Sequence, residues 1–468
     1  MSDAVATSQQ GLAGKYPPYP EYKDSGLEWL GEIPAHWNIS RIKYVAQLNP
    51  SKSEVRGLSD DTIVSFIPME AIGERGEIDV SRTRLLGDVL TGYSYITDGD
   101  VILAKITPCF ENGKGAVVHG LENGIGFATT EVIPARPYRK CDAQFLYYLF
   151  TSNPFKALAE GSMYGAGGQK RVADSFVAEY HFAEAPTDER ENIAAFLDYE
   201  TARIDRLIAQ QQRLIELLKE KRQAVISHAV TKGLNPNAPM KDSGVEWLGQ
   251  VPEHWQCVPF GLLVSRADLG GNYLGGQEEN GIPFLKMGNL GRGCIVLDKL
   301  ECLEEGSSFD DAHRLSMGDF LFNTRNSLDL VGKVAVWHDE LEFALYNSNL
   351  LRVRFKKDFI SSPDFMGFVF NSSGALGWLA LLAKGTTSVA AIYYKDLRSM
   401  VVPIPPVDEQ NAISSFISKC LSRLDTLEEK AIQSINLMNE RRTALISAAV
   451  TGKIDLRGWT PPADEVAA

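Results

Sequence analysis

The sequence predicts an α+β protein built from two pseudo-symmetric domains separated by two long antiparallel coiled-coil helices. Three observations predict this fold: a repeated opening segment, a repeated helical segment, and strand-rich middle segments that differ between the two halves. With 468 residues and 44% hydrophobic content, the chain is too long for one ordinary hydrophobic core. We therefore expect at least two domains.

An internal repeat organises the chain. The segment YKDSGLEWLGEIPAHW at 22–37 returns as MKDSGVEWLGQVPEHW at 240–255, with 11 of 16 positions identical. The 46 residues from Pro186 likewise match those from Pro406 at 18 positions. The two offsets, 218 and 220 residues, nearly agree, so each repeat is domain-sized and is not one link of a solenoid.

The repeat sets the expected domain boundaries. We expect a polar tail at 1–19, a first domain at 20–185, a first helix at 186–233, a second domain at 234–405, a second helix at 406–453 and a tail at 454–468.

The middle of each half is predicted to be mainly strands. Short apolar runs are broken by Gly, Asn and Asp, as in DVILAKI at 100–106 and DFLFNTR at 319–325. Helices such as DAQFLYYLFTS at 142–152 interrupt the strands. An α+β domain fits each half.

Heptad spacing predicts the two long helices, each roughly 60 Å long at 1.5 Å per residue. Neither apolar face can be buried by its own helix, so we expect the two to pack together as an antiparallel coiled coil. Gly233 with Pro236 and Gly452 are expected to end the helices. The predicted seam consists of Leu197, Ile204, Leu207, Leu214, Leu218, Val225, Ile417, Leu424, Leu427, Met438 and Leu445.

Four motifs at the ends of the two halves are KDSGLEWLGEIPAHW, KDSGVEWLGQVPEHW, PIPPVDEQNAI from Pro403 and RRTALISAAVTGKIDL from Arg441. Together they resemble the specificity subunit of type I restriction–modification systems. The resemblance extends from about Tyr22 to about Leu456. The first helix entry departs from the pattern, because Arg190 stands where the second entry has Gln410.

The resemblance implies a function and a set of partners. Each variable domain would be a target-recognition domain that reads one half of a bipartite double-stranded DNA target. The helices would set the spacing and dock two methyltransferase subunits, and restriction/translocase subunits would join the full complex. S-adenosylmethionine, ATP and Mg would then serve those partner subunits only.

Two loops in each half carry candidate DNA-contacting residues. Bases are read by side chains with paired donors and acceptors, and phosphates by cations and backbone amides of Gly-rich loops, although solvated polar turns have the same composition. The candidates are Lys105, Thr107, Lys114, Gln169, Lys170 and Arg171 in the first half, and Asn323, Arg325, Asn326, Thr386, Thr387, Ser388, Tyr393, Tyr394 and Lys395 in the second.

Other polar pairs have simpler interpretations. His36-Trp37 and His254-Trp255 follow prolines and are expected to pack a turn against a domain, not to catalyse a reaction. Lys221-Arg222 and Arg441-Arg442 could hold phosphate or an acidic partner, but a cation late in a helix also suits the helix dipole.

Sequence motifs for catalysis and for metal binding are missing. The strings YPPY at 16–19 and SNPF at 152–155 each lack one feature of an amino-methyltransferase motif, and every GK pair lacks the following Ser or Thr of a phosphate loop. The six cysteines are scattered, without zinc-site spacing. We therefore expect no catalytic residue and no metal ligand, and hence a non-catalytic recognition subunit.

Charge leaves an alternative open. A net charge of −13 opposes simple electrostatic binding of nucleic acid, so a duplicated protein-binding scaffold without direct DNA readout remains a second hypothesis. A self-sufficient modification or cleavage enzyme conflicts with the missing motifs. The start lacks the features of a signal peptide, and the apolar run at 376–383 is too short to span a bilayer. We expect a cytoplasmic protein without membrane contact.

Overall fold

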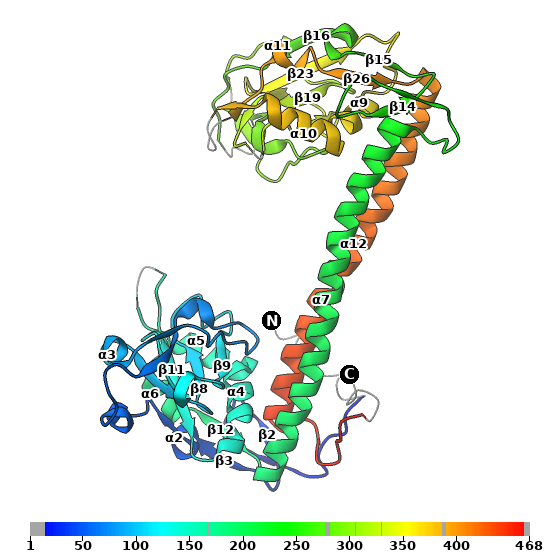
Figure 1. Ribbon diagram of the computed structural model, residues 1–468. Helices are drawn as coiled ribbons and strands as arrows, with labels where there is room; N and C mark the ends of the chain where they lie inside the picture. Colours follow the sequence, from blue (N-terminus) through cyan, green and yellow to red (C-terminus); the bar gives the residue numbers. More distant parts are fainter. Residues whose placement is uncertain are drawn as a thin grey trace. The chain divides into compact units, whose positions relative to one another are not determined.

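The computed structural model describes residues 15–165, 168–276, 281–304, 306–328, 330–385 and 390–462. The chain divides into two compact units, unit 1 comprising Met1–Gln211 with Gln433–Ala468 and unit 2 comprising Gln212–Ile432. Two long helices, α7 (Thr187–Lys232) and α12 (Val407–Val450), each contribute residues to both units (Figure 1). The predicted α+β fold class with two long helices is confirmed.

Unit 1 contains two four-stranded sheets. One has the strand order β4-β11-β8-β9 and is antiparallel throughout, and the other has the order β6-β5-β10-β7 with a parallel β5–β10 pair. Two further strand pairs, β1–β2 and β3–β12, complete the unit. The strands are β1 Tyr22–Asp24, β2 Glu32–Pro34, β3 Asn38–Arg41, β4 Ala46–Leu48, β5 Ile63–Ile67, β6 Thr83–Leu85, β7 Ser94–Thr97, β8 Val101–Ala104, β9 Gly115–Val117, β10 Ile125–Ala128, β11 Val132–Pro137 and β12 His181–Glu184.

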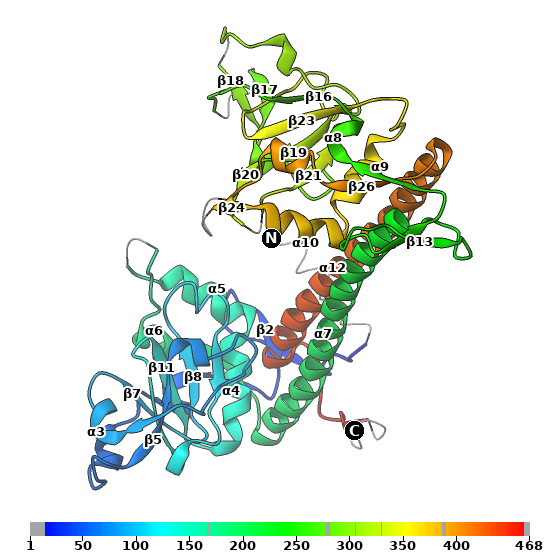
Figure 2. The same cartoon turned by 45° about the horizontal axis from the view of Figure 1, so that its top comes forward.

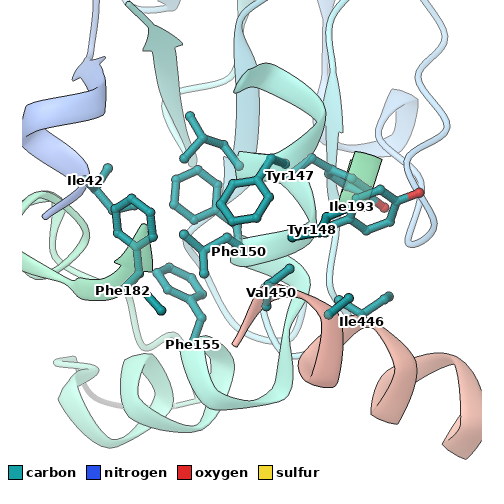
Figure 3. Packing of buried hydrophobic residues seen from close by; sticks show 14 of the residues in the cluster. Ile42, Tyr147, Tyr148, Phe150, Phe155, Phe182, Ile193, Ile446 and Val450 are labelled. Atoms are coloured by element: carbon teal, nitrogen blue, oxygen red, sulfur yellow. The ribbon is translucent and has the colours of Figure 1, made fainter. Parts of the chain in front are cut away.

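Helix α4 of unit 1 joins the β4-β11-β8-β9 sheet to the long helices. Helix α4 packs against β8 and β9, and its aromatic residues meet the start of α7 and the end of α12 in one buried cluster (Figure 3). That cluster includes Tyr148, Phe150, Ile193, Ile446 and Val450. The short helices are α2 Ile42–Val45, α3 Leu86–Val89, α4 Ala143–Thr151, α5 Asn153–Ser162 and α6 Asp174–Glu179.

Unit 2 repeats this plan. Its sheet β16-β23-β19-β21 matches β4-β11-β8-β9, and β18-β17-β22 matches β6-β5-β10, again with one parallel pair. The strands are β13 Met240–Asp242, β14 Gln250–Pro252, β15 Gln256–Pro259, β16 Val264–Leu269, β17 Ile282–Leu285, β18 Glu301–Leu303, β19 Phe320–Asn323, β20 Arg325–Asn326, β21 Val334–Val336, β22 Leu345–Tyr346, β23 Leu350–Phe355, β24 Lys384–Gly385, β25 Ala390–Ala391 and β26 Val401–Ile404. The helices are α8 Phe260–Leu263, α9 Pro363–Phe370, α10 Ser373–Leu382 and α11 Tyr394–Leu397.

A glutamate near the start of each long helix, buried in unit 1 and half-buried in unit 2, holds the repeated opening segment. In unit 1 Glu189 accepts hydrogen bonds from Tyr19 (2.9 Å) and Trp37 (3.0 Å) and lies 2.6 Å from the ring nitrogen of His36. Burial, followed by the hydrogen bond to Glu189, raises the pKa of Tyr19. The packing interpretation of His36-Trp37 is thereby confirmed.

Unit 2 has the same arrangement with one partner fewer among the described residues. Glu409 accepts from Trp255 (3.1 Å) and lies 2.8 Å from the ring nitrogen of His254. Both tryptophans are fully buried, so each glutamate satisfies an indole N–H that has no access to water. This arrangement explains why the opening and helical segments repeat together.

The two helix entries differ in charge, as the sequence suggested. Arg190 is buried and forms ion pairs with Asp142 (3.0 Å) and Glu184 (3.0 Å). Gln410, also buried, donates instead to the carbonyls of Phe359 (2.7 Å) and Pro405 (3.0 Å). Burial raises the pKa of Asp142, and the Arg190 charge acts in the opposite direction.

In each unit the segments of α7 and α12 lie side by side and antiparallel. Within unit 1, Arg442 Nε lies 3.6 Å from Asp205 Oδ1. Within unit 2, Lys219 Nζ lies 3.8 Å from Glu428 Oε1, and Arg222 contacts Asp425. Residue numbers rise along α7 while those of their partners fall along α12, which establishes the antiparallel direction. The cations at Arg222 and Arg442 therefore join the two helices.

The predicted seam is correct for one heptad position and wrong for the other. Leu197, Ile204, Leu218, Ile417 and Leu445 are buried, and Val225, Leu424 and Met438 are half-buried. The companion residues Leu207, Leu214 and Leu427 are 41%, 39% and 48% exposed.

The second seam position lies four residues after the first, not three. In α7 this position holds the buried Thr201 and Ile208, and further along Arg222; in α12 it holds Glu428 and Arg442. Both spacings place a residue on nearly the same helix face. The prediction chose the leucines three residues after the first seam position because they are hydrophobic. The position four residues after it, which does face the partner helix, holds several charged residues that form ion pairs between the helices.

Glycine ends both long helices as predicted. Gly233 and Gly452 have φ values of 72° and 70°, a left-handed backbone that suits glycine.

Among the described residues, no single helix has both the length and the apolar composition needed to span a bilayer. The pair Pro363–Phe370 and Ser373–Leu382 has that length and composition when its two helices are taken together, but the pair is bent by 70°.

Candidate nucleic-acid interface

In unit 1 the two predicted loops meet beside the end of β8. Arg171 forms antiparallel bridges with Ile106 on one side and Tyr164 on the other. The Thr107 amide donates to the Lys170 carbonyl (3.0 Å), and the Thr107 hydroxyl donates to the Gly168 carbonyl (2.7 Å). We call residues 105–107, 164–165 and 168–171 loop platform 1.

Loop platform 1 gathers most of the candidates from the first half. Lys105, Thr107, Gln169, Lys170 and Arg171 all belong to it, and the side chains of Gln169 and Lys170 are exposed. Lys114 is different, because it is half-buried and its ammonium donates to the Met69 carbonyl (3.2 Å). We therefore leave Lys114 out of the platform.

Acidic neighbours partly balance the charge of loop platform 1. The guanidinium of Arg171 donates from Nε and Nη2 to the two carboxylate oxygens of Glu131, at 2.9 and 2.8 Å. These hydrogen bonds hold the pKa of Glu131 below its usual range. Lys105 lies 3.8 Å from Asp174, whereas Lys170 has no ion pair among the described residues.

Unit 2 builds the equivalent structure from β20, β25 and β24, which form a three-stranded sheet. Strands β20 and β24 are labelled in Figure 2. Arg325 pairs with Ala391 as Ile106 pairs with Arg171, and Lys384 pairs with Ala391 as Tyr164 pairs with Arg171. We call residues 324–326, 384–385 and 390–391 loop platform 2. The two platforms share a backbone plan and present different side chains.

The candidates of the second half are only partly brought together. Arg325 is exposed on β20, and the half-buried Asn326 follows it. Asn323 is fully buried and accepts from the Arg325 amide (3.2 Å). Because its side chain is buried behind the strand end, the prediction that Asn323 faces DNA is wrong in this structure.

The remaining candidates follow β25. Tyr393 is exposed with the Lys395 ammonium 5.8 Å from its ring centre, and Tyr394 packs against the core. Thr386, Thr387 and Ser388 lie outside the described residues.

Sequence reasoning missed Glu131 and Tyr164. Glu131 lies just before β11, 40 residues from its partner Arg171, and no motif marks it. Tyr164 is 61% exposed beside Arg171 and offers an aromatic face on the same platform. The only signal in the sequence was a tyrosine directly before the glycine-containing segment that starts at Gly165. Among the described residues, no group of three or more His, Cys, Asp or Glu side chains is arranged to hold a metal ion.

Comparison with known proteins finds one matching family model and several similar proteins. Residues 276–437 match the family model of the type I restriction modification DNA specificity domain. The chain is 36% identical over 190 residues to the EcoAI specificity subunit of Escherichia coli, which covers 40% of this chain and 31% of that protein. It is 24% identical over 452 residues to the MjaVIII specificity subunit of Methanocaldococcus jannaschii, covering 93% of this chain and 97% of that protein.

Solved structures share the fold. A chain from a study of complex assembly and conformational transition of the type I R-M system has a TM-score of 0.70 and 19% identity, covering 89% of this chain and 98% of that one. The HsdS subunit from Thermoanaerobacter tengcongensis has a TM-score of 0.54 and 17% identity, covering 90% and 98%.

The similarity to curated relatives extends beyond residues 276–437. The matched regions span about a third of the EcoAI specificity subunit and 56% of the EcoKI specificity subunit of Escherichia coli, whereas the match to MjaVIII runs nearly end to end. The chain is therefore similar to type I restriction–modification specificity subunits, in one case over nearly its whole length, and it shares the fold of the two solved structures.

Proposed function

We propose that the chain is the sequence-specific DNA-binding subunit of a type I restriction–modification complex. Each variable domain reads one half of a bipartite target through its loop platform. The observation that carries this proposal is the duplicated platform: the same three-segment backbone arrangement occurs once in each unit with different side chains.

The exposed side chains suit recognition of two unlike half-targets. Loop platform 1 presents Gln169 and Lys170, and loop platform 2 presents Arg325. Gln and Arg offer paired hydrogen-bonding groups to base edges, and Lys neutralises phosphate. Because the two sets differ, the two halves of the target should differ in sequence.

The long helices fix the separation between the half-targets and dock two methyltransferase subunits. A rigid connection lets two weak half-site contacts act as one strong contact. A chain with a net charge of −13 gains from partners that supply phosphate contacts. The chain itself is non-catalytic: S-adenosylmethionine, ATP and Mg serve the methyltransferase and restriction/translocase subunits, and the complex acts in the cytoplasm.

The second candidate is a protein-binding scaffold without DNA readout. The acidic net charge favours it, as do exposed apolar side chains on the long helices such as Leu217 and Leu437. Such a scaffold would assemble with the methyltransferase but would not alter which DNA sequence the complex binds.

Selection from a randomised duplex library separates the two candidates. The full chain, assembled with the methyltransferase subunits of its host, should enrich a bipartite sequence with an unspecified spacer. Binding should weaken steeply as salt rises, because phosphate contacts release counterions. Enrichment of no sequence, or of the same sequence by the methyltransferase without this chain, would reject direct readout.

A further inference from the structure

Arg171 is held in place by both its backbone and its side chain. Its backbone N–H and C=O are both paired with Tyr164, at 2.9 and 3.1 Å. The neighbouring residues are bonded to the β8 loop, with Thr107 N to Lys170 O at 3.0 Å and Val172 N to Lys105 O at 2.9 Å. Arg171 is therefore the central residue of a three-segment ladder, and little backbone motion is open to it.

The side chain is fixed through one edge of the guanidinium. Nε donates to Glu131 Oε2 at 2.9 Å and Nη2 donates to Glu131 Oε1 at 2.8 Å. Glu131 is itself anchored, because its carbonyl accepts from the Lys105 amide at 2.9 Å. Glu131 thus determines the direction in which the Arg171 guanidinium points.

The other edge of the guanidinium stays available. Arginine has five N–H groups, and the side-on contact to Glu131 uses one from Nε and one from Nη2. The Nη1–Nη2 edge has no hydrogen-bond partner among the described residues, and the Arg171 side chain is 34% exposed. That edge is the one that donates two parallel hydrogen bonds to the O6 and N7 atoms of guanine.

We infer that Arg171, oriented by Glu131, reads a guanine in the half-target bound by unit 1. This inference rests on the proposed function and makes it specific at one residue. A fixed arginine discriminates better than a free one, because the base contact need not first restrict a long side chain. Glu131 is a positioning residue here, since it acts through Arg171.

Unit 2 lacks an equivalent of the Arg171–Glu131 pair, so the inference applies to only one half of the target. In loop platform 2 the position equivalent to Arg171 holds Ala391, as the matching bridges show. The position equivalent to Glu131 holds Asn349, whose carbonyl accepts from the Thr324 amide at 3.0 Å as that of Glu131 accepts from Lys105. The other half-target should therefore be unaffected by changes at Arg171 or Glu131.

Selection of targets by variants in the assembled complex tests the inference. With Arg171→Ala, preference for guanine at one position of one half-target should fall by roughly 5- to 150-fold, and the other half-target should be unchanged. Arg171→Lys keeps the charge but lacks the planar guanidinium that Glu131 orients, so it should weaken the guanine preference while retaining more overall affinity.

The Glu131→Gln variant separates the effect of Glu131 on the direction of the Arg171 side chain from the effect of its negative charge on DNA binding. Removing an acid near DNA should tighten binding to unselected duplex, yet guanine preference at the same position should decrease because Arg171 loses its fixed direction. A merely structural pair would not change one base of the target. Arg82→Ala is the matched control: Arg82 forms an exposed ion pair with Glu70 (2.9 Å) in the same unit, and its loss should leave the selected sequence unchanged.

The outcomes distinguish the two claims. If the unaltered complex selects a bipartite target and both Arg171 variants select the same one, the inference is overturned and the proposed function stands. Loss of all binding by Arg171→Ala, with an unchanged target for Arg171→Lys and Glu131→Gln, would assign the pair a structural role and also overturn it. If the unaltered complex selects no sequence, the proposed function itself fails.

Discussion

At the scale of residues, the repeated glutamates show how one side chain can hold a whole segment. Glu189 satisfies the buried hydroxyl of Tyr19 and the buried indole of Trp37, whereas Glu409 satisfies the indole of Trp255. The side chain of Glu189 is also the more buried of the two, at 7% exposed against 25%. The two glutamates should therefore differ in what they contribute to stability.

Glu189→Ala should destabilise the chain more than Glu409→Ala. The first change leaves two buried donors unpaired and the second leaves one, at about 1–3 kcal/mol for each. Urea unfolding of each full-length variant measures the difference. Equal losses of stability would contradict the different roles given to the two sites.

The exposed lysine of loop platform 1 should act through phosphate. Lys170→Ala should weaken DNA binding by a similar factor for every sequence and lower the salt dependence by about one unit of the log–log slope. Binding titrations at several salt concentrations measure both effects. Lys23→Ala should change neither, because this exposed lysine lies on β1, which pairs with β2 and is not part of the platform. A change in the selected sequence by Lys170→Ala would mean that Lys170 reads a base.

At the scale of elements, the correction to the helix seam concerns one heptad position. Ile204 is buried at 4% exposed, whereas Leu207, three residues later, is 41% exposed. In water the exposed leucine contributes little to packing between α7 and α12. Hydrophobicity alone does not reveal which of these residues faces the partner helix.

Ile204→Ala should therefore cost about 2–5 kcal/mol of stability, and Leu207→Ala less than about 1 kcal/mol. The comparison is made by urea unfolding of the full chain without partner subunits, so that only contacts within the chain are counted. A Leu207→Ala variant as unstable as Ile204→Ala would restore the original seam.

The same elements show how far the sequence could be read. The repeat predicted the two units because matching ends at a constant offset require matching structures, and the first seam series followed from its heptad spacing. The second series was misplaced because charged residues such as Glu428 occupy it, and their pairing with Lys219 depends on the register of two distant segments. Asn323 was grouped with the DNA-contact candidates because it ends a predicted strand, yet its side chain at the end of β19 is buried.

The candidate site, like the helix seam, was predictable from local sequence patterns but not where distant segments meet. The two loops of unit 1 were identified by composition, and the structure brings them together through the Ile106–Arg171 bridge. Glu131 was missed because its role exists only through a contact made 40 residues away along the chain. Side chains that act alone can be read from a sequence, whereas side chains that act through another need the fold.

At the scale of the whole molecule, each unit contains the structural parts that separate recognition of one half-target would require. Each has its own sheets, its own loop platform and its own glutamate at a helix entry. The ends of each variable segment are joined by a strand pair, β3–β12 in unit 1 and β15–β26 in unit 2. A variable segment closed in this way should be exchangeable without disturbing the long helices.

Methylation mapping of a host genome tests the central claim most directly, after residues 42–180 have been replaced by the corresponding segment of a relative with a different target. We predict that one half of the methylated bipartite sequence changes to the donor's half, while the other half and the spacer length stay the same. A methylated sequence that is continuous, or one that stays wholly unchanged while the complex remains active, would contradict independent reading by the two units.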